Sequence, residues 1–81
     1  MRVTTLSGTV YDFSSDGSLV RRIGGAPLRR DHEWLRVVHV EPIVVGKPMR
    51  LTLDGVAMVG LTERVTTPVV KVMDTVRPTS H

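Results

Sequence analysis

Apolar and polar residues alternate with a period of two along most of the chain. Residues 9–13 and 49–53 show this alternation most clearly, and it is typical of strands that bury one face. Val and Thr, which fit a pleated sheet better than a helix, are abundant, whereas Ala, the best helix former, occurs only at positions 26 and 57. No segment has the spacing of an amphipathic helix. The pattern therefore predicts an all-β chain.

Turn-forming residues divide the pattern into five to seven short strands. Residues 14–18 and the pair Asp54-Gly55 predict hairpin turns, because Asp-Gly supplies a backbone with positive φ. We expect the second to be a two-residue type I′ turn. Pro42 and Pro68 are expected to end strands, because proline donates no hydrogen bond to a sheet. The expected strands cover residues 3–6, 9–13, 19–23, 35–40, 49–53, 56–67 and 69–73.

A Val-rich sheet is protected from aggregation when its edges are closed. The sequence thus predicts a small five- to seven-stranded antiparallel barrel or rolled sheet, SH3-like or OB-like. We expect one β domain over residues 1–74 and a flexible C-terminal tail over residues 75–81. The polar, aperiodic segment 28–34 is expected to be a loop.

Composition limits how such a small domain is stabilised and where it acts. The chain has 81 residues and no Cys, and its three His are scattered, so we expect no disulfide, metal or cofactor. A core of this size leaves a narrow stability margin, which favours a homo-oligomer. The N-terminus lacks the apolar region of a signal peptide, and no apolar run approaches ~20 residues. We therefore expect a cytoplasmic protein without a membrane partner.

The residues that commonly carry catalysis do not form a recognisable constellation. Asp31, His32 and Glu33 are adjacent, so in an extended segment they point to alternate faces and do not converge on one reacting atom. Gly24-Gly25 lacks the spacing of a dinucleotide-binding loop, and Gly46-Lys47-Pro48 lacks the hydroxyl residue of a Walker loop. We predict that the chain is not an enzyme.

Binding chemistry is concentrated around Trp34, since Trp and Arg are over-represented among interface hot spots. The alternative for Trp34 is a structural role, capping one end of the barrel. The net charge of +3 is mild, and acidic residues lie inside the basic cluster, which weighs against a nucleic-acid partner. The candidate binding residues are Arg21, Arg22, Arg29, Arg30, Glu33, Trp34 and Arg36.

Several short motifs follow one another along the chain, namely Val20-Arg21-Arg22-Ile23, Pro27, Arg30-Asp31-His32-Glu33-Trp34, Val45-Gly46-Lys47-Pro48-Met49 and Thr66-Thr67-Pro68-Val69-Val70. Their order resembles that of small uncharacterised proteins of actinobacteria and of their bacteriophages. Carried over by position, the resemblance selects Arg21, Arg22, Glu33, Trp34, Gly46 and Pro48. The chain departs from it with Thr67 in place of Ser and with a shorter loop before Asp31. The resemblance implies a small phage-encoded accessory protein that binds a host component.

These observations predict a non-enzymatic small binding module. Its expected partner is a host or self protein surface, in the host cytoplasm if the chain is phage-encoded. One alternative is a nucleic-acid-binding small β-barrel, because arginines beside an aromatic residue are typical of single-strand binders. The other alternative is a structural virion or assembly component.

Overall fold

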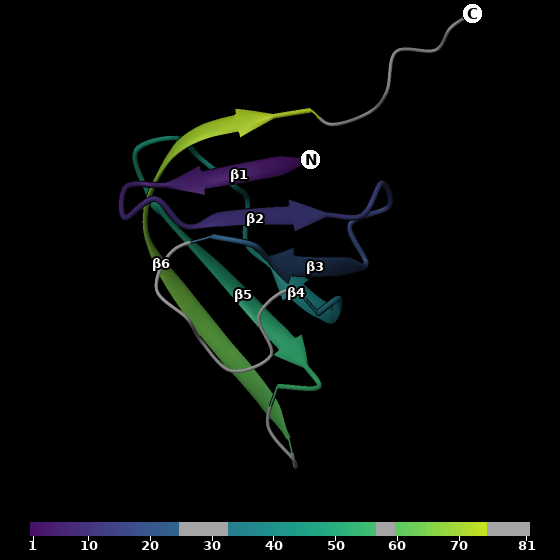
Figure 1. The fold of residues 1–81 in the computed structure, drawn as a ribbon. Helices are drawn as coiled ribbons and strands as arrows, with labels where there is room; N and C mark the ends of the chain where they lie inside the picture. Colours follow the sequence, from purple (N-terminus) through teal and green to yellow (C-terminus); the bar gives the residue numbers. More distant parts are fainter. Residues whose placement is uncertain (25–32, 57–59, 75–81) are drawn as a thin grey trace, which may run out of the picture.

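A computed structural model describes residues 1–24, 33–56 and 60–74 of the chain, and every regular element in them is a strand (Figure 1). The strands are β1 (Arg2–Thr5), β2 (Val10–Phe13), β3 (Leu19–Arg22), β4 (Leu35–Val40), β5 (Pro48–Asp54) and β6 (Leu61–Met73). The all-β prediction is therefore confirmed. The predicted flexible tail, residues 75–81, lies outside the described residues, as does most of the predicted loop.

The six strands form a closed antiparallel barrel in which each pairs with its neighbours in sequence. Pairing of β1 with β6, in which Val3 lies opposite Val72, closes the ring. This confirms the prediction of a small five- to seven-stranded barrel. The consecutive order is that of a meander, which differs from the Greek-key order of an OB-fold.

Alternation along the strands directs one set of apolar side chains into the barrel. Met49, Leu51 and Leu53 of β5 are all buried, whereas Pro48 before them and Arg50 between them are exposed. Tyr11 and Phe13 are buried as well, so two of the three aromatic residues fill the core. The core comprises Val3, Tyr11, Phe13, Val20, Leu35, Met49, Leu51, Leu53, Val56 and Val69.

The predicted turn between β2 and β3 is confirmed in detail. Gly17 has a φ of +76°, which a side chain at this position would rarely adopt. The Asp16 carboxylate accepts hydrogen bonds from the Ser18 hydroxyl, the Ser18 N–H and the Ser14 hydroxyl. These bonds, the Ser18 hydroxyl first, lower the pKa of Asp16 to about 2. The acid therefore acts in the turn itself, by fixing the chain reversal.

The prediction of a two-residue turn at Asp54-Gly55 is wrong. Gly55 has a positive φ of +97°, but Asp54 pairs with Leu61, so the connection runs from residue 55 to residue 60. Val56, which was expected to begin the returning strand, is instead buried in the core. The free energy gained by burying this side chain favours the longer connection over a tight hairpin.

The prediction that Pro68 ends a strand is also wrong. β6 continues through Pro68, which lies opposite Pro48 where the register between β5 and β6 shifts. The Pro68 carbonyl still accepts a hydrogen bond from the Leu6 N–H, so the residue lacks only a donor. Pro42, by contrast, lies two residues after Val40, the last residue of β4, as expected for a residue that marks the end of a strand. β6 therefore pairs with β5 and β1 and leaves no open sheet edge at Pro68.

Candidate functional site

The pairing of β3 with β4 brings two of the candidate residues into contact on the outside of the barrel. Leu19 lies opposite Arg36 and Val20 lies opposite Leu35, so the same register continued by one residue places Arg21 opposite Trp34. The guanidinium carbon of Arg21 lies 4.8 Å from the centroid of the Trp34 ring. This is a cation–π contact between residues that are 13 positions apart in the sequence.

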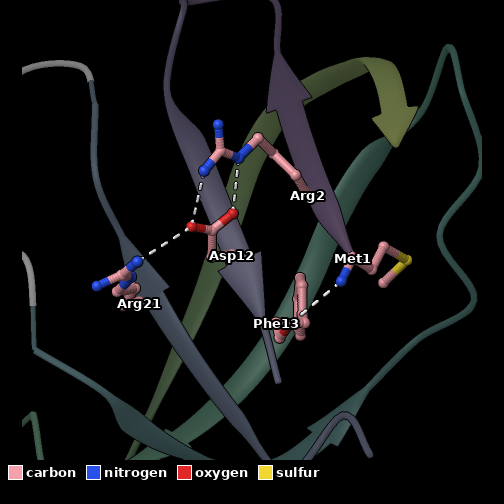
Figure 2. A network of polar contacts seen from close by, with 5 residues as sticks. All are labelled: Met1, Arg2, Asp12, Phe13 and Arg21. Carbon is pink, nitrogen blue, oxygen red and sulfur yellow. Dashed lines mark hydrogen bonds and ion pairs between the residues drawn. The ribbon is translucent and has the colours of Figure 1, made fainter. Parts of the chain in front are cut away.

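An acidic residue of β2 holds the arginine in this position (Figure 2). Asp12 lies between Arg2 of β1 and Arg21 of β3, and accepts from Arg2 Nε at 2.7 Å and from Arg2 Nη2 at 3.1 Å. Its other contact is an ion pair with Arg21 Nη2 at 3.5 Å. Asp12 is thus buried on the outer side of the barrel, beneath two more exposed arginines.

The charges around Asp12 change its protonation. Hydrogen bonds from Arg2 are the largest cause of a lowered pKa for this carboxyl, and the positive charges of Arg2 and Arg21 add to the effect, while partial burial opposes it. The same pair raises the pKa of Arg2. Asp12 therefore remains an anion at neutral pH and can fix the two arginines on either side.

The two strands that bring Arg21 and Trp34 together also carry exposed apolar side chains. Trp34 is 45% exposed although Arg21 lies against its ring, and Leu19 and Val38 are exposed to a similar degree. Arg36 of β4 is also exposed, and it lies between Trp34 and Val38 in the sequence. We define the β3–β4 face as Leu19, Arg21, Trp34, Arg36 and Val38. It combines three accessible apolar side chains with two guanidinium groups.

The structure joins some of the predicted binding residues and separates others. Arg21, Trp34 and Arg36 share the β3–β4 face, and Glu33 is exposed directly before Trp34. Arg22 is buried and pairs with the core residue Tyr11, on the other face of β3 from Arg21. It therefore does not contribute to this surface. Arg29 and Arg30 lie outside the described residues.

Three residues that matter here were not among the sequence candidates. Leu19 and Val38 resembled ordinary strand residues, and nothing in the sequence alone distinguishes an exposed Val from a buried one in such a strand. Asp12 carried a signal, because a charged residue stands between the core aromatics Tyr11 and Phe13. Its two arginine partners depend on the strand register, which the sequence does not contain.

Within residues 1–24, 33–56 and 60–74, no three His, Asp or Glu side chains gather closely enough to hold a metal ion. The same part of the chain has no helix long and apolar enough to cross a membrane. The chain matches no protein-family model, no curated protein and no solved structure. The β3–β4 face is therefore the basis for a functional proposal.

Proposed function

We propose that this chain is a non-enzymatic binding module that recognises another protein through the β3–β4 face. The observation that carries the proposal is the half-exposed Trp34, stacked on Arg21, which Asp12 holds in place. A fixed indole loses little conformational entropy when a partner covers it. Trp and Arg are also the residue types that most often dominate the binding energy of an interface.

The surroundings of Trp34 favour a protein partner over single-stranded nucleic acid. Single-strand binders stack successive bases on several aromatic side chains along a basic groove. Tyr11 and Phe13 are buried in the core, so Trp34 is the one aromatic residue of the chain with an accessible ring. Leu19 on β3 and Val38 on β4 add exposed apolar area to the same face, which suits a protein surface better than a phosphate backbone.

The resemblance to actinobacterial and phage proteins directs the choice of partner. We propose a host protein, met in the host cytoplasm, and a homo-oligomeric binding module. Light scattering after size exclusion tests the assembly, and a single species at the monomer mass of 9.0 kDa would exclude it. This result would leave the proposed role of Trp34 unaffected.

Trp34→Ala is expected to weaken partner binding strongly without unfolding the barrel. The partner is first captured from an actinobacterial lysate, with and without nuclease, and its dissociation constant is then measured by calorimetry. Loss of the central anchor costs about 2 kcal/mol, which is roughly a thirtyfold higher Kd. Circular dichroism of the variant checks that the fold is retained.

Val65→Ala provides the matched control, because Val65 is apolar and 51% exposed but lies opposite Arg50, four residues farther along β6 than the Leu61 that shares a row with Asp54 and Arg36. This variant should bind with unchanged affinity. A folded Trp34→Ala variant with the affinity of the original chain would refute the proposal. A captured partner that disappears on nuclease treatment would instead support the nucleic-acid alternative.

A further inference from the structure

One end of the barrel presents the most exposed aliphatic side chains of the described residues. Leu6, in the turn between β1 and β2, is 69% exposed, and Val45, between β4 and β5, is 59% exposed. The Leu6 N–H donates to the Pro68 carbonyl and the Gly46 N–H donates to the Val69 carbonyl. Both connections are therefore held beside the same part of β6, and Figure 1 shows them at one end of the barrel.

Basic residues flank these aliphatic side chains. Lys47 and Lys71 are the two lysines of the chain, and both are exposed. The Lys47 carbonyl accepts a hydrogen bond from Val69, two residues before Lys71, so the two lysines lie close to the same point of β6. We define the aliphatic end as Leu6, Val44, Val45, Lys47, Val70 and Lys71. Its positive charge disfavours contact with the same end of a second copy.

The aliphatic end differs in composition from the β3–β4 face. It has no aromatic residue and no Arg, the types that are enriched in protein interfaces, whereas Lys is depleted there and Leu and Val are under-represented among hot spots. Aliphatic side chains on turns, flanked by Lys, are suited to a lipid surface. The apolar groups can enter the boundary between headgroups and acyl chains, while lysines approach anionic headgroups.

We propose, contrary to the expectation from the sequence that the protein has no membrane partner, that the aliphatic end docks on an anionic lipid membrane as a peripheral contact. Leu6, Val44 and Val45 enter the headgroup boundary, and Lys47 and Lys71 approach the lipid phosphates. Glu41, an acidic residue, begins the same connection. Its N–H donates to the Arg50 carbonyl, so this acidic residue lies beside a basic one. The proposal goes beyond the role of the β3–β4 face and does not depend on it.

Co-sedimentation of the full chain with vesicles tests the proposal. One set of vesicles is pure phosphatidylcholine, and the other contains about one third phosphatidylglycerol. The chain should sediment with the anionic set, and raising the salt from about 0.1 M to about 1 M should release much of it. Lys47→Glu and the double change Leu6→Ser with Val45→Ser should each lower the partition coefficient about tenfold.

Two control variants separate this surface from the rest of the molecule. Leu61→Ser replaces an equally exposed aliphatic residue on the β5–β6 hairpin, and Trp34→Ala removes the anchor of the β3–β4 face. Both should bind anionic vesicles as the original chain does. Circular dichroism of each variant confirms that folding is unchanged.

Several outcomes would overturn the proposal. They are no sedimentation with anionic vesicles, equal sedimentation with both vesicle sets, or a loss with Leu61→Ser as large as that of the double variant. In another outcome, soluble polyglutamate abolishes vesicle binding while the change of Leu6 and Val45 to Ser has no effect. This result would assign the aliphatic end to an acidic protein segment instead.

Discussion

Leu53→Ala is expected to lower the free energy of unfolding by about 2–5 kcal/mol, the usual range for truncating a buried leucine. Leu53 is fully buried near the end of β5, opposite Val37 on β4 and Thr62 on β6. Truncation leaves a cavity between strands whose mutual pairing limits relaxation. The measurement is urea unfolding followed by circular dichroism at 25 °C.

The size of the domain makes this loss severe. Small domains have total stabilities near the lower end of about 5–15 kcal/mol, so Leu53→Ala should leave a substantial unfolded fraction without denaturant. Leu61→Ala, on the exposed start of β6, should stay within about 0.5 kcal/mol of the original chain. Equal losses from the two variants would contradict the assignment of Leu53 to the core.

The strands that follow from local alternation could be predicted from the sequence. Residues 49–53 gave a strand close to the observed β5, because each inward residue is apolar and its neighbours are polar or tolerate exposure. The turn at Asp16-Gly17 could also be predicted, since its hydrogen bonds join residues within five positions of each other. In both cases the determining interactions are local.

Predictions failed where distant contacts outweigh local preference. Val56 is buried in the core and does not pair in the expected hairpin. Pro68 lies inside β6, where a register shift accommodates its missing donor. Neither the burial of Val56 nor the register shift can be obtained from a turn signal. They depend on how the strands close into a ring.

The candidate site shows the same division. The period of two already places Arg21 and Arg22 on opposite faces of β3, so the burial of Arg22 agrees with a pattern visible in the sequence. Selecting both arginines as binding residues gave too much weight to their proximity in the chain. The stacking of Arg21 on Trp34 and its support by Asp12 require three neighbouring strands, and no spacing rule predicts them.

Asp12→Asn is expected to lower the free energy of unfolding at pH 7 by about 1–2 kcal/mol, because it removes a charged acceptor from Arg2 and Arg21. The expected loss of stability is modest because both arginines are more than one third exposed, so water can hydrate them once the carboxylate is removed. Urea unfolding between pH 2.5 and pH 7 measures the change.

The pH dependence identifies the cause of this loss. The pKa of Asp12 is lower in the folded protein than its ordinary value, with hydrogen bonds from Arg2 as the main cause. Its contribution is therefore complete above the unfolded pKa of about 3.9 and is lost as the pH falls through the folded value. The difference between Asp12→Asn and the original chain should shrink at low pH. Glu63→Gln, a change of the same charge on the exposed face of β6, should cause a smaller loss at neutral pH.

Asp12→Asn also tests whether the carboxylate positions the β3–β4 face. Without the anion, Arg21 loses one of its two observed contacts and should occupy its place over Trp34 less often. Trp34 is the single tryptophan of the chain, so its fluorescence reports this change directly. We expect an altered emission spectrum and severalfold weaker partner binding in the folded variant. An unchanged spectrum together with unchanged affinity would show that Asp12 stabilises the barrel without ordering the face.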